Sequence, residues 1–245
     1  MINSQYIVTI KETIVVKLGK KLSTIISNLN EIQFQVKQAL NQSPYNQHVE
    51  IIAVTKSVSV ERTQEAIDAG IFHLGENRPE GLMNKVDSVN GNIIWHYIGS
   101  LQTRKVKQVL PYIDYLHSLD RISLADEIEK RAQKPLKCFV QVNVSGEQSK
   151  HGLNEEEALQ FIETLKTYQN IHVIGLMTMA PLTEDTQVIR NVFKKLKQLQ
   201  LLIKQKNYSH APCTELSMGM SNDFEVAIEE GATFVRIGTA LVGEC

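Results

Sequence analysis

The sequence predicts an α/β fold, a single (β/α)8 barrel of the TIM type, from two observations. Eight short apolar runs alternate with segments of helical spacing, and the runs lack the polar alternation of a strand with one wet face. Such runs are typical of parallel strands covered on both sides. The chain has 245 residues, and one such barrel needs about 250. We therefore expect one domain over 1–245, with no role assigned to 1–19.

The first expected element is a helix over 20–41 that packs on the barrel. Its apolar residues recur at helical spacing, with Lys, Asn and Gln between them. Ser43-Pro44 ends it, because a proline cannot continue a helix. The sequence stops a few residues after the last expected strand. This helix could therefore occupy the place of a final barrel helix.

The remaining elements follow in strict alternation. The expected strands are 49–54, 71–74, 93–98, 113–116, 137–144, 172–174, 214–216 and 233–237. The expected helices are 60–69, 79–86, 102–110, 121–133, one beginning after Asn154, 185–205 and 221–230. Gly70 is placed to stop the first of these helices. Asn154 and Glu157 have the spacing of a capping box, and 185–205 carries one apolar stripe.

Charge and hydropathy exclude several classes of protein. The 26 Lys and Arg balance 27 Asp and Glu, so nothing supports a nucleic-acid-binding stripe or a polybasic membrane anchor. No run reaches the roughly 18 apolar residues of a membrane span. Ile14-Val15-Val16 is too short for a signal-peptide core. We expect a cytoplasmic protein with no nucleic-acid or membrane partner.

The cysteines give no sign of a metal site or a disulfide framework. Cys138, Cys213 and Cys245 are widely separated and form no CxxC pair. We expect free thiols in a reducing compartment and no bound metal.

Lys56 is the first candidate functional residue, because it directly follows the apolar strand that ends in Ala53-Val54-Thr55. The carboxyl ends of the strands form the active face of such barrels. Partial desolvation there would lower the pKa of the lysine, and a neutral amine is what an aldehyde needs to form a Schiff base. The alternative is a lysine whose ammonium simply reaches solvent at a strand end.

The ends of the last two strands form a second candidate site. Gly219 permits close backbone approach, and Ser221 is expected to cap the next helix and offer an anion site there. Gly238 and Thr239 can offer backbone N–H groups and a hydroxyl to a phosphate, which this fold commonly binds at these loops. Arg236, at the end of the last strand, would point into the barrel mouth, where it needs a partner. The alternatives are a plain serine cap for Ser221 and an ion pair with a carboxylate for Arg236.

Polar segments after other strands are weaker candidates. Gly75 to Arg78 follows the second strand, and Gln141 to Lys150 follows the fifth. His96 could be an acid–base group, although a histidine satisfied within the core is the more common case.

Together these segments resemble the pyridoxal phosphate homeostasis protein family, which is similar to the N-terminal barrel of alanine racemase. The matching segments run in order from the first strand to the last. They are AVTK at 53–56, GENR at 75–78, HYIGSLQ at 96–102, QVNVSGEQSKHG at 141–152, GLMTM at 175–179, LSMGMSNDFEVAI at 216–228 and VRIGTAL at 235–241. Arg104 departs from the family, where many members carry asparagine.

The resemblance implies a cofactor and residues that hold it. Lys56 would form a Schiff base with pyridoxal 5′-phosphate, and Ser221, Gly238 and Thr239 would hold its phosphate. Arg236 matches the family arginine that faces the pyridine nitrogen.

Three further residues carry weaker assignments from the same resemblance. Asn77 is similar to an asparagine of the cofactor pocket. Glu147 and Lys150 match a polar pair associated with cofactor handling.

An arginine beside the pyridine nitrogen bears on activity. It is a permanent cation, which disfavours a protonated ring nitrogen and leaves the ring a poorer electron sink. Racemases of this fold add a tyrosine from a second domain, and no such domain is expected in this sequence. His96 is the one candidate we can name for a second base opposite Lys56.

The expected function is therefore intracellular pyridoxal 5′-phosphate (vitamin B6) homeostasis, with the cofactor held without substantial turnover. The alternative is an amino-acid racemase or related enzyme that uses the same lysine; a barrel for another phosphate ester is a third reading. We expect a monomer, with pyridoxal-phosphate-dependent apo-enzymes as candidate recipients.

Overall fold

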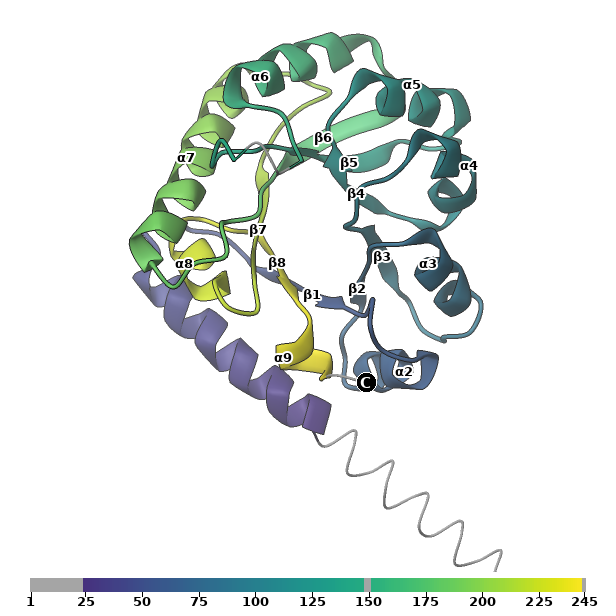
Figure 1. Ribbon diagram of the computed structural model, residues 1–245, viewed down its shortest axis with the longest axis vertical. Coiled ribbons are helices and arrows are strands. Elements are labelled where there is room, and N and C mark those ends of the chain that lie inside the picture. The colour runs from purple at the N-terminus through teal and green to yellow at the C-terminus, as the bar shows by residue number, and fades with distance from the viewer. Residues whose placement is uncertain (1–23, 148–150, 244–245) are drawn as a thin grey trace, which may run out of the picture.

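The computed structural model describes residues 24–147 and 151–243. Within these residues, strands β1 to β8 form a closed parallel barrel in chain order, and β8 pairs with β1 (Figure 1). The predicted fold class is confirmed. The strands are β1 (Glu50–Val54), β2 (His73–Glu76), β3 (Ile94–Tyr97), β4 (Tyr115–Leu119), β5 (Leu136–Gln141), β6 (Ile171–Met177), β7 (Glu215–Met220) and β8 (Phe234–Ile237).

Helices follow the strands on the outside of the barrel. They are α2 (Val60–Asp68), α3 (Pro79–Val86), α4 (Val106–Val109), α5 (Ile122–Arg131), α6 (Glu155–Thr164), α7 (Thr186–Gln205), α8 (Phe224–Glu229) and α9 (Thr239–Val242). The 3₁₀ turns Thr103–Lys105 and Leu110–Tyr112 flank α4. The expected helix over 102–110 is therefore three short pieces.

Local sequence explains how several helices begin and end. Asn154 and Glu157 form the expected capping box on α6. Gly70 follows α2 with a φ of +92°, which glycine adopts readily. Ser221 is not a helix cap, contrary to expectation, because α8 begins at Phe224 and its N-cap residue is Asp223. Ser221 lies instead in the turn between β7 and α8.

Several strands are displaced from their expected positions. The run 71–74 predicted a strand that begins only at His73, and the run 113–116 predicted one that begins only at Tyr115. Ile71 and Ile113 are buried but precede the strands. The strands continue instead through polar residues. His117 of β4 is one of them, and its side chain points into the barrel toward Ser217 of β7. Apolar runs alone therefore placed the beginnings of these two strands two residues too early.

The N-terminal helix, described over 24–42, runs along the outside of the barrel beside α8 and α9 (Figure 1). The helix's own Ile25 and Ile32 are buried. Its Asn28 Nδ2 donates to Leu241 O of α9. It therefore packs where a long final helix would otherwise lie. Residues 20–23 of the expected helix and the segment 1–19 lie outside the described residues.

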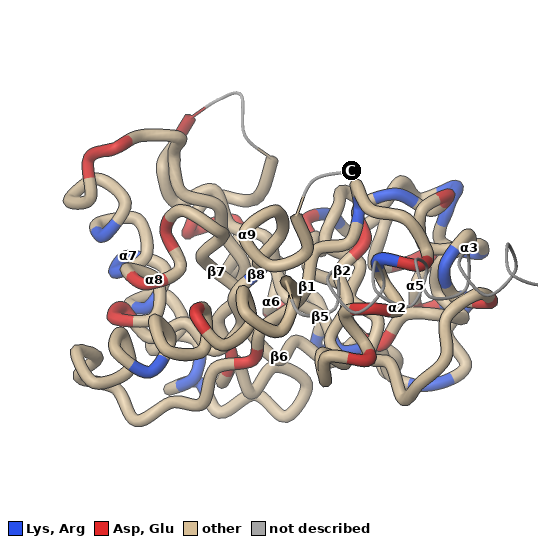
Figure 2. Tube along the Cα trace, turned by 90° about the horizontal axis from the view of Figure 1, so that it is seen from below, with Lys and Arg blue, Asp and Glu red and all other residues tan. Residues whose placement is uncertain are grey.

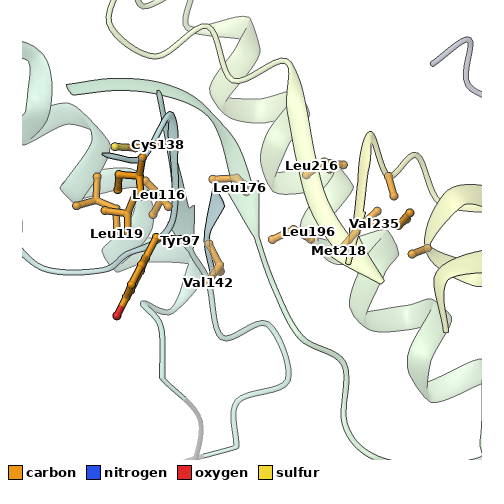
Figure 3. Close-up of a cluster of buried hydrophobic side chains, with 14 of the residues drawn as sticks. Tyr97, Leu116, Leu119, Cys138, Val142, Leu176, Leu196, Leu216, Met218 and Val235 are labelled. Carbon is orange, nitrogen blue, oxygen red and sulfur yellow. The ribbon is translucent and has the colours of Figure 1, made fainter. Parts of the chain in front are cut away.

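The hydrophobic core fills the layer between strands and helices, and Figure 3 shows part of it. Tyr97 and Leu116 belong to this layer, as do the free thiols of Cys138 and Cys213. Burial raises the pKa of both thiols, that of Cys213 to about 12, which disfavours the reactive thiolate form. Cys245 lies outside the described residues.

Charged residues are spread over the outside of the molecule. Figure 2 shows positions of both signs interspersed along the outer elements. Among residues 24–147 and 151–243, no helix is both long and apolar enough to cross a membrane.

Candidate functional site

Lys56 lies in the turn that follows β1, at the end of the barrel where all strand carboxyl ends meet. Its side chain is exposed. The expectation that the strand end partly desolvates it is therefore wrong for this structure. Its position at the barrel mouth is as expected.

The strands beside β1 bring two other candidate segments next to Lys56. Val54 pairs with Gly75 of β2, and Ala53 pairs with Ile237 of β8. The half-buried Asn77 follows β2, so it flanks the Lys56 turn on one side. The loop that follows β8 flanks it on the other side.

The loops after β7 and β8 meet at this same edge of the barrel. The N–H of Gly238 donates to Ser221 Oγ over 3.3 Å. Gly238 also borders β1, because a Cβ there would lie 3.8 Å from Val54 Cβ. Thr239 follows with an exposed side chain. The hydroxyls of Ser221 and Thr239 are neutral donors that suit phosphate oxygens.

Arg236 lies deeper, on β8, and is only 4% exposed. Its Nη1 donates to Ser217 Oγ and Ser217 O over 2.6 and 2.9 Å, and its Nη2 donates to Thr178 O over 3.0 Å. The alternative of an ion pair is wrong: among the described residues, Arg236 pairs with no carboxylate.

The charge of Arg236 survives its burial. Desolvation lowers the pKa of the guanidinium to about 10, while Asp223 opposes the shift. Arg236 is therefore still a cation at neutral pH. Three oxygen acceptors fix its plane beneath the mouth of the barrel.

His96 is a core histidine and is not available as a base at the mouth. It is 0% exposed, and its two ring nitrogens lie 2.9 Å from nitrogens of His73 and His117. Burial lowers its pKa well below the ordinary value, with smaller contributions from His73 and Lys137. The second-base candidate is therefore wrong, and the core alternative is confirmed.

A buried polar cluster lies behind the Lys56 turn. Lys85 of α3 donates to Thr55 O over 2.5 Å and to Glu76 Oε1 over 2.6 Å. Thr55 Oγ1 donates to the same carboxylate oxygen over 2.5 Å. The cluster ties the last residues of β1 and β2 to α3. It thereby fixes the backbone immediately before Lys56.

The remaining candidates are placed only in part. The backbone carbonyl of the half-buried Glu147 accepts from Asn143 Nδ2 over 2.8 Å. Lys150, its expected partner, lies outside the described residues. Arg104 is exposed, in the 3₁₀ turn after β3.

Sequence reasoning missed His73, His117, Ser217 and Lys85. One signal was present: consecutive strands β2, β3 and β4 each carry a histidine. No comparable signal marked Lys85, because a lysine on an amphipathic helix is ordinarily a surface residue.

The chain is similar in sequence and in fold to known proteins. A family model, described as alanine racemase, N-terminal domain, matches residues 27–245. A pyridoxal phosphate homeostasis protein of Aquifex aeolicus is 42% identical over 198 residues, which are 79% of this chain and 86% of the relative. PipY of Synechococcus elongatus, solved with PLP bound, superposes with a TM-score of 0.79 at 28% identity, covering 89% of this chain and 100% of PipY.

A more distant structure shows the fold alone. Alanine racemase of Corynebacterium glutamicum superposes with a TM-score of 0.69 at 12% identity. The superposition covers 90% of this chain and 61% of the racemase.

Proposed function

Because this chain belongs to the pyridoxal phosphate homeostasis protein family, within the wider alanine racemase N-terminal domain family, we propose that it binds pyridoxal 5′-phosphate on Lys56 and holds it without sustained turnover. The bound cofactor supplies an aldehyde that condenses with an amine and a ring that withdraws electrons. The observation that carries the proposal is the contact between Gly238 and Ser221. It gathers phosphate donors beside β1, the strand that precedes the Lys56 turn.

Each candidate residue has a defined task in this proposal. Lys56 presents an exposed amine in a turn whose backbone is fixed by the buried cluster behind it. Ser221 and Thr239 would donate hydrogen bonds to the phosphate through their hydroxyls, and Gly238, whose N–H donates to Ser221 Oγ, would hold the two loops together around it. Asn77, half-buried beside the turn, lines the pocket.

Arg236 favours holding over turnover. Its permanent cation is held in place by three oxygen acceptors, and a cation facing the ring nitrogen would disfavour the protonated form of that nitrogen. An unprotonated ring stabilises a carbanion poorly. His96 is buried with both ring nitrogens occupied, so it supplies no second base.

The same proposal has a cellular side. We infer that the protein acts in the cytoplasm as a monomer and releases pyridoxal 5′-phosphate to apo-enzymes that need it. The exposed position of Lys56 supports exchange at an accessible mouth. The buried thiols of Cys138 and Cys213 are compatible with a reducing compartment.

A turnover assay separates this proposal from a racemase. The protein is loaded with pyridoxal 5′-phosphate, incubated with L-alanine and other L-amino acids, and the D-enantiomers are quantified. We expect stable retention of the cofactor and no sustained racemisation. Racemisation near the usual enzyme range of about 1–10³ s⁻¹ would overturn the holding function. A protein that retains no cofactor would refute binding itself.

A further inference from the structure

A continuous line of hydrogen bonds crosses the interior of the barrel beneath Arg236. His117 Nδ1 lies 2.8 Å from Ser217 Oγ, and His117 Nε2 lies 2.9 Å from His96 Nδ1. His96 Nε2 lies 2.9 Å from His73 Nδ1. At the far end, His73 Nε2 lies 3.6 Å from Glu50 Oε2, a charge contact rather than a hydrogen bond. We call His73, His96 and His117 the histidine column.

Arg236 favours one direction of hydrogen bonding along this line. A guanidinium only donates, so Ser217 Oγ accepts from Arg236 and has its own hydrogen left for His117 Nδ1. Each neutral imidazole has one donor and one acceptor. When Ser217 Oγ donates that hydrogen to His117 Nδ1, then His117, His96 and His73 all carry their own hydrogen on Nε2. The column thus connects the cation of Arg236 at one end with the carboxylate of Glu50 at the other.

The two ends of the column differ in access to water. His96 and His117 are each 0% exposed, and aromatic rings enclose them. Tyr115 stacks on His96 and Phe139 stacks on His117, each with ring centroids 4.4 Å apart. The side chain of His73 is 17% exposed and lines a cavity of about 600 Å³ at the barrel floor, together with Glu50 and His48.

We propose that the histidine column is a proton-linked relay that couples protonation of His73 at the barrel floor to the hydrogen bond beside Arg236. Uptake of one proton from water makes His73 an imidazolium that faces Glu50. Its Nδ1–H then donates to His96 Nε2, which must therefore be an acceptor. In this state His96 and His117 each carry their one hydrogen on Nδ1, so each ring has released the hydrogen on Nε2 and taken one up on Nδ1. His117 then donates to Ser217 Oγ, which now accepts from both His117 and Arg236.

The charge balance of that exchange is simple. One proton enters, His73 carries the added charge, and the two inner rings remain neutral with one hydrogen each. Ser217 Oγ then accepts on both of its lone pairs, and its own hydrogen turns away from His117. Because a hydroxyl that no longer donates within a chain is less polarised and is a weaker acceptor, it holds Arg236 less firmly. His73, His96 and His117 are therefore positioning residues for Arg236. Their effect on the cofactor, unlike the column itself, rests on the proposed function.

The surroundings of the column support this behaviour. Burial lowers the pKa of His73, while Glu50 and Asp114 raise it and Lys137 lowers it further. Burial also lowers the pKa of His117, with contributions from His96 and Arg236. The ionisable groups that face the column are Glu50, His48, Asp114, Tyr115, Lys137 and Arg236.

The first test uses the cofactor-free protein and ¹⁵N NMR of the imidazole nitrogens. We expect Nε2–H tautomers for all three histidines at neutral pH. On acidification, His117 should switch to Nδ1–H at the pH where His73 takes up a proton. His96→Phe keeps an aromatic ring but breaks the line, so His117 should no longer respond.

Two further variants serve as a second break in the line and as a control. His73→Phe removes the floor end at a less buried position, and it should also abolish the response of His117. His172→Asn is the matched control, because His172 also lies at the barrel floor but outside the column. It should leave the response intact. Nδ1–H tautomers at neutral pH, or a response of His117 that persists in His96→Phe, would overturn the relay.

The second test measures the Kd for pyridoxal 5′-phosphate at about pH 5 and about pH 7.5, because the pKa of His73 lies below the ordinary imidazole value of about 6.5. Acidification should weaken binding at least about threefold more in the wild type and His172→Asn than in His96→Phe. Equal ratios in all three proteins would refute the coupling to the cofactor. Absence of binding at both pH values would refute the proposed function, while the NMR result would still decide the relay.

Discussion

Lys85 of α3 donates a 2.6 Å hydrogen bond to Glu76 at the end of β2, and both side chains are almost completely buried. The same ammonium donates to the carbonyl of Thr55, the residue before Lys56. The other carboxylate oxygen, Glu76 Oε2, has no hydrogen-bond partner among the described residues. The pair thus holds the backbone of the Lys56 turn by burying two opposite charges that depend on each other.

Removing one partner should be far more costly than removing both. Lys85→Met leaves the Glu76 carboxylate buried and uncompensated, so we expect a loss of about 3–5 kcal/mol in the free energy of unfolding. The double variant Glu76→Gln/Lys85→Met should recover much of that loss. Urea denaturation of the three proteins measures it. Equal losses in the single and double variants would show that the charge pairing is not what stabilises this turn.

The phosphate donors can be tested without touching Lys56. Hydrogen bonds to a charged group contribute about 1.5–3 kcal/mol each, so Ser221→Ala or Thr239→Ala should raise the Kd for pyridoxal 5′-phosphate about 10- to 100-fold. The midpoint of thermal unfolding should change little, because both residues lie at the rim of the barrel. Equilibrium dialysis gives the Kd. Unchanged retention in the double variant would mean that the phosphate lies elsewhere.

Acid should destabilise the protein through its buried histidines. Burial holds the pKa values of His96 and His117 well below 6.5, so the folded protein binds fewer protons than the unfolded chain below that pH. Stability should therefore fall as pH drops below about 6.5, approaching about 1.4 kcal/mol per pH unit for each ring. Urea unfolding across this range measures the slope. His96→Phe should remove the share of the slope that His96 contributes, and an unchanged slope would contradict this origin.

Gly219 lets the end of β7 approach α8. Its φ is +91°, and an added Cβ would lie 2.6 Å from Ala227 Cβ and 2.9 Å from Phe224 Cα. Gly219→Ala should therefore lose about 1–3 kcal/mol through overpacking in addition to backbone strain. Gly70→Ala is a matched control, because Gly70 has a φ of +92° and no atom within 4 Å of the added Cβ. Equal unfolding free energies for the two variants would show that only the backbone matters.

The fold was readable from the sequence because strands covered on both faces must be apolar. Strand boundaries were less readable, since His73 and His117 lie within strands yet point into the barrel. Lys56 could be found because its position depends only on where one apolar run ends. Ser221 was misassigned as a cap because the sequence does not show that α8 starts three residues later, at Phe224.

The histidine column shows what a linear sequence conceals. His73 and His96 are 23 residues apart, and His96 and His117 are 21 apart. Only the register of β2, β3 and β4 brings their rings into line. The burial of Lys85 was concealed for a similar reason, because its partner Glu76 lies on another element.

Borohydride reduction followed by peptide mass spectrometry tests the central claim most directly. The wild-type protein is incubated with pyridoxal 5′-phosphate, reduced and digested, and the modified lysine is located. We expect the cofactor's mass on the peptide that contains Lys56, and its loss in Lys56→Ala together with the visible absorbance band of the bound cofactor. Modification spread over other lysines, or labelling and absorbance that persist in Lys56→Ala, would contradict the account.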